Sequence, residues 1–319
     1  MRNFISIIIA TCNRCESLKN TFDSFLSQEC DGTFEFEIIV VDNNSKDGTK
    51  VTVESYLPKL NGANASRLRY LFEPTKGKSY ALNKGIREAK GNIIAFADDD
   101  VVVDSQWLRQ IVQCLEEYRC DGIGGRILPS YPQETPQWIK DNKHLLAGPI
   151  VFYDQGESIK KYEKPMREFL GTNFVFKREV FDQCGLFRTD LGPGTPRIGE
   201  DTEFVNRILN KNKVLYYCGK ALVWHPVDVQ RMTLRYLAKW YMTLGRYRVL
   251  GDDQGKIPEH LTYYFGVPRY LIGEIVHNGL YALKNIFNKP EFLKAWKQLF
   301  INWGRAMEIR RIYQCTKSV

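Results

Sequence analysis

The chain lacks the features that mark several common classes of protein. Its 319 residues contain no stretch near the roughly 18 unbroken apolar residues that a membrane-spanning helix needs. The first apolar run, residues 4–10, is too short for a secretory signal and precedes no small-residue cleavage pattern, so we expect a cytoplasmic protein. The eight cysteines include one Cys-x-x-Cys pair, Cys12 and Cys15, and no second pair at metal-binding spacing. This argues against a zinc site and favours reduced thiols.

Glycine-rich phosphate-binding loops are also missing. The Gly-Lys-Ser sequence at 77–79 looks like the end of a P-loop, but the glycine required five residues earlier is Phe72. The glycines at 122–125 lack the spacing of a dinucleotide-binding fingerprint and lie far from the first predicted strand. Lys76 and Lys78 remain able to contact a diphosphate as point charges, with a solvated turn as the alternative.

Positive charge is concentrated in the last part of the chain. Residues 1–225 carry 30 Lys and Arg against 30 Asp and Glu, whereas residues 226–319 carry 15 against 7. The whole formal net charge of +8 therefore belongs to the last 94 residues. This asymmetry predicts a boundary near residue 225, between a domain of residues 1–225 and a basic, aromatic extension of residues 226–319.

Apolar runs alternate with amphipathic segments over the first hundred residues. Residues 4–10, 37–41, 67–72 and 92–97 predict buried strands, and 17–28, 49–57 and 79–89 predict the helices between them. Such alternation is typical of an α/β fold with right-handed crossovers and a doubly wound, mostly parallel sheet. Further strand-like runs follow at 174–177 and 214–217.

Polar and acidic residues follow three of the predicted strands, at 11–13, 42–44 and 98–100. Ligands of open parallel sheets bind at the carboxyl ends of the strands, so we expect these residues to converge on one edge. Three consecutive aspartates repel one another unless a cation or a set of donors neutralises them, and Mg²⁺ or Mn²⁺ prefers such oxygen ligands. The alternative for the aspartates is an acidic turn that caps the next helix.

Two further residues are candidates for chemistry. A glycine- and proline-rich loop at 192–199 leads into a predicted helix that begins near Asp201. A carboxylate there can act as a general base, or it can simply cap the helix. His225 follows an apolar run, and a lone histidine at a strand end is structural unless a metal lies nearby. The suspected cation favours the metal role.

These motifs together resemble glycosyltransferase family 2 over about residues 3–225. The matching segments are Ile7–Arg14, Ile39–Thr49, Gly77–Gly85, Phe96–Asp100, Gly171–Asn173, Gly199–Asp201 and Val223–His225. Their order and spacing are more specific than any single motif. The resemblance implies a GT-A fold and an inverting, metal-dependent, hexosyltransferase-like enzyme that uses a nucleotide diphosphate sugar. The acceptor side of this domain would begin at about residue 120. It does not extend over residues 226–319.

The resemblance also assigns roles on the donor side. Ala10, Thr11 and Asn13 would line the nucleotide pocket. Asp42 would read the base, and Lys78 would lie near the diphosphate.

The aspartate cluster would hold the ribose and the metal. Asp98 and Asp99 would contact the donor, and Asp100, Asp99 and His225 would bind the Mn²⁺ or Mg²⁺ ion. The family pattern is an aspartate, any residue and an aspartate, so three in a row leave the working pair open between Asp98/Asp100 and Asp99/Asp100. Asp201 would be the general base. The chemistry agrees, because an acceptor hydroxyl needs a base opposite a departing diphosphate.

The expected substrates are a UDP-sugar and a saccharide or lipid-linked saccharide, as in cell-surface polysaccharide or glycolipid synthesis. Two alternatives belong to other classes. One is a nucleotide-binding regulatory or scaffolding module without turnover, against which the intact Asp201 and His225 argue. The other is a nucleotidyltransferase, which would need a glycine-rich loop after the first strand that this sequence lacks.

Residues 268–287 form an amphipathic helical pattern in the basic extension. The apolar arc consists of Leu271, Ile272, Ile275, Val276, Leu280, Leu283, Ile286 and Phe287. This arc would dock on the catalytic domain or on a second subunit of a homo-oligomer. Alternatively, it lies in the plane of an anionic membrane, where nearby basic and aromatic residues contact headgroups. No nucleic-acid-binding motif accompanies the basic residues, so we expect no nucleic-acid partner.

Overall fold

The structure is a computed structural model that describes residues 3–61, 67–163, 169–195, 198–251 and 261–317. The chain divides into two compact units. The first contains residues 1–130 and 151–226, and the second contains residues 131–150 and 227–319. The grouping of residues 131–150 with the C-terminal segment is a feature that the charge distribution did not predict.

A nine-stranded sheet forms the centre of the first unit, in the order β3-β2-β1-β4-β8-β6-β9-β5, with β7 paired to β9. The strands are β1 (Asn3–Thr11), β2 (Phe34–Asp42), β3 (Leu68–Phe72), β4 (Ile93–Ala97), β5 (Val102–Val103), β6 (Gly122–Ser130), β7 (Ile159–Lys161), β8 (Asn173–Lys177) and β9 (Leu215–Pro226). Six of them run in one direction, and β5, β7 and β8 run against it. The predicted α/β class and mostly parallel sheet are confirmed.

The order of the first four strands fixes where a ligand can bind. The chain moves outward from β1 to β2 and β3, and then returns to place β4 on the other side of β1. The reversal between β1 and β4 leaves a crevice at their carboxyl ends, which is where open α/β sheets bind ligands. Thr11 ends β1, Asp42 lies beside it at the end of β2, and Asp98 follows β4.

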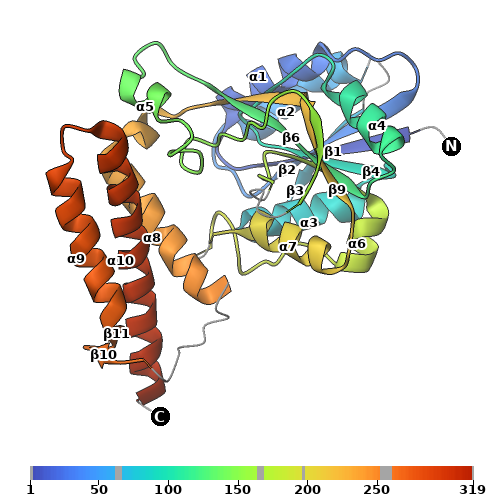
Figure 1. The fold of residues 1–319 in the computed structure, drawn as a ribbon. Helices are drawn as coiled ribbons and strands as arrows, with labels where there is room; N and C mark the ends of the chain where they lie inside the picture. The colour runs from blue at the N-terminus through green and yellow to red at the C-terminus, as the bar shows by residue number, and fades with distance from the viewer. Residues whose placement is uncertain (1–2, 62–66, 164–168, 196–197, 252–260, 318–319) are drawn as a thin grey trace. The chain divides into compact units, whose positions relative to one another are not determined.

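Helices cover both faces of this sheet (Figure 1). Helices α1 (Cys15–Leu26), α2 (Thr49–Leu60) and α4 (Trp107–Glu117) lie on one face, and α3 (Lys78–Glu88), α6 (Arg178–Cys184) and α7 (Glu200–Asn210) lie on the other. The strands are apolar on both sides because both sides are covered. In β1, for example, Ile7, Ile8 and Ile9 are all fully buried.

The second unit is helical. It contains α5 (Gln137–Asp141), the short 3₁₀ helix η1 (Val229–Met232), α8 (Leu234–Gly251), α9 (Arg269–Lys284) and α10 (Lys289–Lys317). A small hairpin of β10 (Tyr263–Tyr264) and β11 (Val267–Pro268) precedes α9. Helix α10 packs against both α8 and α9. The α8–α10 crossing is close, because a Cβ on Gly245 or Gly304 would lie 2.0 Å from a backbone oxygen of the other helix.

The predicted helical extension is therefore present. Among the described residues, no helix combines the length and apolar character needed to cross a membrane.

Candidate active site

Asp98 is the first residue after β4 and has two donors. The Lys78 ammonium donates to Oδ1 at 2.6 Å, and the Thr172 hydroxyl donates to Oδ2 at 2.6 Å. Burial by itself raises the pKa of Asp98, but the charge of Lys78 and the Thr172 hydrogen bond outweigh it and hold the pKa well below its ordinary value. Asp98 is therefore ionised at neutral pH.

Asp100 lies beside His225 because β5 and β9 are antiparallel neighbours, with Val102 opposite Trp224. Asp100 Oδ1 is 3.5 Å from Nε2 of His225, whose side chain is 3% exposed. The same oxygen is buried and accepts no hydrogen bond from any described residue. A buried carboxylate oxygen without a donor is costly unless a cation satisfies it.

Ligand atoms of Asp98, Asp100 and His225 all lie within 4.8 Å of one another. Two carboxylates and an imidazole form a donor set that Mn²⁺ or Mg²⁺ accepts. The Asp100 oxygen that accepts no hydrogen bond and the close approach of the three groups fit such an ion. This geometry favours Asp98 and Asp100 as the working pair that the sequence left open.

Asp99 is not part of this three-residue group and instead lines a neighbouring pocket. Its pKa is raised to about 7, first by burial and then by the negative charge of Asp100. Asp99 is thus assigned to the pocket, whereas the aspartates on either side of it belong to the group with His225.

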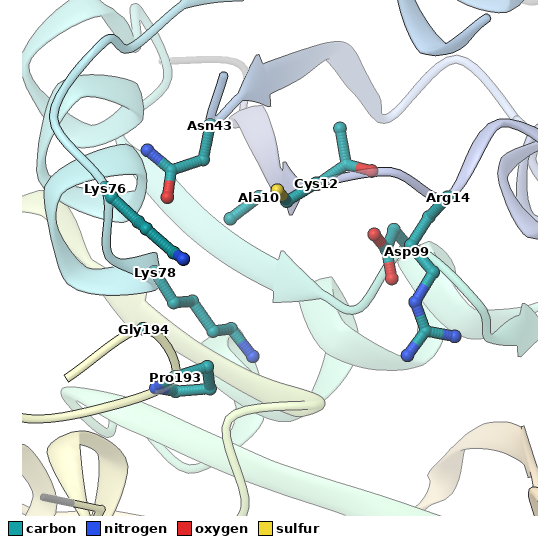
Figure 2. A pocket seen from close by; sticks show the side chains of 10 residues that line it. Ala10, Cys12, Arg14, Asn43, Lys76, Lys78, Asp99, Pro193 and Gly194 are labelled. Atoms are coloured by element: carbon teal, nitrogen blue, oxygen red, sulfur yellow. The ribbon is translucent and has the colours of Figure 1, made fainter. Parts of the chain in front are cut away.

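The pocket has a volume of about 270 Å³ and opens at the carboxyl ends of β1 and β2 (Figure 2). It is lined by Ala10, Thr11, Cys12, Arg14, Asn43, Lys76, Lys78, Asp99, Pro193 and Gly194. Four of the predicted donor residues, Ala10, Thr11, Lys78 and Asp99, are among them. Three cationic side chains, Arg14, Lys76 and Lys78, give this pocket the charge to hold an anion.

Asn43 shapes one wall of the pocket. Its side chain donates to the carbonyls of Glu73 and Thr75 and accepts from the backbone N–H of Gly77. Gly77 has φ +136°, a conformation that glycine adopts and other residues resist. The next N–H, of Lys78, donates to the carbonyl of Pro193. The loop before α3 and the loop at 191–195 are thereby joined.

Asn13 and Asp42 lie beside the pocket without lining it in the part of the chain that the structure describes. Asn13 accepts from the Lys46 N–H, and its own N–H donates to the Ser45 hydroxyl, so it holds the loop after β2. Asp42 is buried and accepts from the Tyr70 hydroxyl at 2.8 Å and from the Ser45 N–H. These contacts give both residues a structural role in the loops that surround the pocket.

Asp201 lies in the first turn of α7. Its carboxylate accepts from the backbone N–H groups of Gly171 and Thr202. Because Gly171 precedes the Thr172 that contacts Asp98, one short segment connects Asp201 to the aspartate cluster. Asp201 remains partly exposed.

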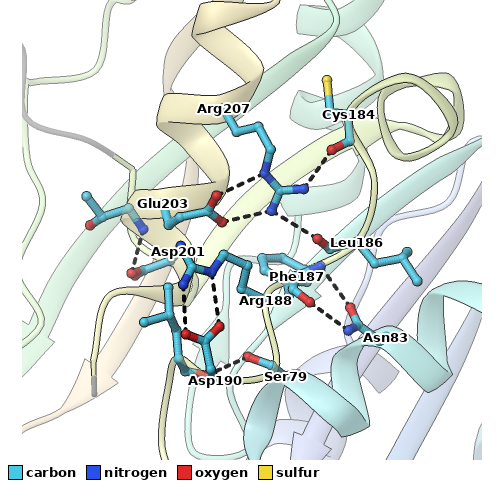
Figure 3. Close-up of polar contacts among 12 residues, drawn as sticks. Ser79, Asn83, Cys184, Leu186, Phe187, Arg188, Asp190, Asp201, Glu203 and Arg207 are labelled. Atoms are coloured by element: carbon cyan, nitrogen blue, oxygen red, sulfur yellow. Dashed lines mark hydrogen bonds and ion pairs between the residues drawn. The ribbon is translucent and has the colours of Figure 1, made fainter. Parts of the chain in front are cut away.

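A network of hydrogen bonds anchors α7 to α3 (Figure 3). Arg207 pairs with Glu203 and donates to the carbonyls of Cys184 and Leu186. The following residue, Phe187, exchanges two hydrogen bonds with the Asn83 side chain of α3. This network fixes the helix that carries Asp201 relative to the helix that carries Lys78.

Glu200 is buried next to Asp201. Its pKa is raised to about 7, by burial first and then by the charge of Asp201, while Lys78 opposes the rise. A Cβ on Gly192 would lie 2.9 Å from the Glu200 carboxyl carbon, so the carboxyl group packs directly on the 191–195 loop. Burial and the neighbouring charge of Asp201 thus favour the neutral, protonated form of the Glu200 carboxyl group.

Several site residues were not singled out from the sequence. Arg14 lies 3.6 Å from Asp100, Thr172 contacts Asp98, and Asn43 organises the pocket wall. All three fall within or beside the family-like segments, which is the only signal that indicated them. Pro193 and Gly194 belong to the glycine- and proline-rich loop that the sequence did indicate, more than 90 residues away from the other lining residues.

The chain matches Glycosyl transferase family 2 over residues 6–185. It is 32% identical over 130 residues to the glycosyltransferase AglE of Haloferax volcanii. This alignment covers 40% of this chain and 41% of AglE. It is 26% identical over 193 residues to the glucosyl-dolichyl phosphate glucuronosyltransferase of the same organism. That alignment covers 59% of this chain and 57% of the relative. The chain thus matches about half the length of these relatives.

The solved structure of the mannosyltransferase PcManGT from Pyrobaculum calidifontis, in complex with GDP-Man and Mn²⁺, has a similar fold. The TM-score is 0.58 at 17% identity, and the match covers 100% of this chain and 76% of the other. The fold and the site thus define a protein of the GT-A class, with a candidate cation site beside a basic pocket. The chain belongs to glycosyltransferase family 2.

Proposed function

We propose that this protein is an inverting glycosyltransferase that moves a sugar from a nucleotide diphosphate donor to an acceptor hydroxyl. The observation that carries the proposal is the convergence of three groups at the carboxyl edge of the sheet. These are the Asp98–Asp100–His225 cluster, the pocket lined by Lys76 and Lys78, and Asp201 at the start of α7. Family membership supports the same reaction class.

The donor binds in the basic pocket. Lys76, Lys78 and Arg14 attract the diphosphate, and Thr11 and Asp99 contact the nucleoside side. Asp98, Asp100 and His225 would hold Mn²⁺ or Mg²⁺, which when bound stabilises negative charge on the leaving diphosphate. We expect the donor to be a UDP-sugar.

Asp201 is the proposed general base. Its two backbone donors hold the carboxylate in a fixed orientation, and its partial exposure leaves it accessible to an acceptor hydroxyl. Removal of the hydroxyl proton during attack on the anomeric carbon gives one displacement, which inverts that centre. No covalent sugar–enzyme intermediate is needed.

The acceptor is a saccharide or a lipid-linked saccharide in polysaccharide or glycolipid synthesis. A relative whose name includes glucosyl-dolichyl phosphate supports the lipid-linked form. The excess of basic residues after residue 225 supports work at the cytoplasmic face of an anionic membrane.

The test is a screen of UDP- and GDP-sugars for nucleotide diphosphate release in the presence of Mn²⁺ or Mg²⁺. We expect one UDP-sugar to give release that EDTA abolishes. Release of pyrophosphate would indicate nucleotidyl transfer. Binding of a nucleotide sugar without turnover in the presence of saccharide acceptors would instead support the regulatory module.

A further inference from the structure

The apolar arc of α9 is wider than its neighbouring helix can cover. Leu271 is fully buried, and Ile275 packs with it in a small core that includes Ile309 of α10. Ala282, on the same side, is buried in a second small core. One edge of the predicted apolar arc is thus explained by packing within the helical unit.

The opposite edge of α9 is exposed. Val276, Leu280 and Leu283 are 54%, 63% and 69% exposed, and Phe287, in the turn after the helix, is fully exposed. The spacing of four and three residues aligns Val276, Leu280 and Leu283 in a single stripe along the helix, and Phe287 follows four residues after Leu283. We call these four residues the outer stripe of α9. Contiguous apolar surface of this kind marks an interaction site.

The charges around the outer stripe are mostly positive. Arg269 lies seven residues before Val276 and so begins the same stripe, and Lys284 lies one turn after Leu280. Residues 261–291 contain three Lys or Arg and two acids. Glu274 accepts a hydrogen bond from Asn302 of α10, and Glu291 is paired with Lys294 and accepts from the Tyr281 hydroxyl. An apolar stripe with basic flanks is complementary to a lipid surface with anionic headgroups, whereas two such stripes repel each other.

A second exposed apolar group lies at the start of α9. Phe265, at the tip of the β10–β11 hairpin, is 88% exposed. The hairpin is fixed to α10, because a Cβ on the adjacent Gly266 would lie 3.2 Å from the Tyr313 ring and 3.4 Å from the Arg310 side chain. The exposed aromatic side chain therefore lies at the tip of a hairpin that packs on α10, and an exposed aromatic group of this kind suits an interfacial membrane contact.

We propose that the outer stripe of α9 is a membrane-contact surface that inserts into the interfacial region of an anionic bilayer. Helix α9 then lies in the plane of the surface, with Arg269 and Lys284 at the headgroups. This inference rests on the proposed work at a membrane and names the residues that make the contact. It is independent of the transfer chemistry.

The experiment is sedimentation of the full chain with vesicles of phosphatidylcholine alone or mixed with phosphatidylglycerol. We expect binding to the mixed vesicles that weakens as salt is added. The double variant Leu280→Gln/Leu283→Gln should bind about tenfold more weakly or worse, because each exposed leucine contributes apolar burial. Phe287→Gln should also weaken binding. Because the Phe287 side chain is fully exposed, this substitution removes no packing contact within the protein.

The matched control is Val51→Gln on α2, where the side chain is 69% exposed like Leu283 but lies in the first unit. It should bind vesicles like the unchanged chain. The proposal would be overturned if the leucine and Phe287 variants bound vesicles as well as the unchanged chain does. It would also be overturned if the unchanged chain did not bind vesicles at all. A dimer in solution that the leucine variant converts to a monomer would overturn it as well, since the partner is then a second copy. Donor turnover is also measured without vesicles. This measurement distinguishes a failure of the membrane proposal from a failure of the proposed transferase reaction.

Discussion

The ammonium of Lys78 lies 2.6 Å from Oδ1 of Asp98 and connects the start of α3 to the acidic turn after β4. Both side chains are about one-fifth exposed, so the pair is largely shielded from water. Burial lowers the pKa of Lys78, but the charges of Asp98 and Glu200 outweigh it and raise the pKa above its ordinary value. The pair is charged on both sides at neutral pH.

Replacement of Lys78 should therefore destabilise the fold as well as weaken donor binding. We expect Lys78→Met to lower the free energy of unfolding by about 1–3 kcal/mol, because Asp98 keeps a shielded charge without its cation. Urea denaturation at pH 7 measures the change. Lys50→Met is the control, since Lys50 pairs with Glu54 at 3.8 Å on an exposed helix surface and should cost under about 0.5 kcal/mol. Equal losses in the two variants would contradict the prediction.

Glu200 predicts a pH dependence of stability. Its folded pKa of about 7 lies above the ordinary value, so between about pH 4.5 and 7 the folded state keeps a proton that the unfolded state loses. Its contribution to stability is fully present below about pH 4.5 and is lost as the pH rises to 7. Glu200→Gln should therefore exceed the unchanged chain in stability at pH 8 by about 1–3 kcal/mol, and match it near pH 4.5.

Denaturation curves of both chains across this pH range provide the measurement. Glu179→Gln, at an exposed position on α6, serves as the control and should give a curve parallel to that of the unchanged chain. A Glu200→Gln curve that is also parallel would show that the carboxyl group does not hold its proton in the folded state.

The Asp201→Asn variant distinguishes a role as general base from a role in donor binding. We expect turnover to fall by about 10²- to 10⁴-fold with donor affinity almost unchanged, because the lost group acts on the acceptor. Nucleotide release and isothermal titration with the donor measure the two quantities. Near-normal turnover in this variant would make Glu200 the better candidate for the base.

The proposed cation site can be tested without turnover. At about 100 times its Kd, Mn²⁺ should stabilise the unchanged chain by about 2.7 kcal/mol, seen as a rise in Tm that EDTA reverses. Asp100→Ala and His225→Ala should each reduce this rise strongly. Asp182→Ala, which removes an exposed carboxylate on α6, should leave it intact. An undiminished rise in Asp100→Ala would remove Asp100 from the set of ligands.

The sequence by itself determined the main elements of the first unit and the family. The apolar runs at 4–10 and 92–97 became β1 and β4 within one residue at each end, because strands buried on both faces carry an unambiguous pattern. The carboxyl-edge rule then indicated the acidic turn as part of the site. Those inferences needed only local pattern and the chirality of crossovers.

Only the tertiary structure decided which side chains meet. Asp98 and Asp100 share a cluster that excludes Asp99 because their positions depend on Lys78, Thr172 and His225, all distant in sequence. The division of the α9 arc into a packed edge and an exposed edge depends in the same way on where α10 lies. A sequence pattern records how apolar each position is, whereas the partner of each position depends on long-range packing that no local pattern encodes.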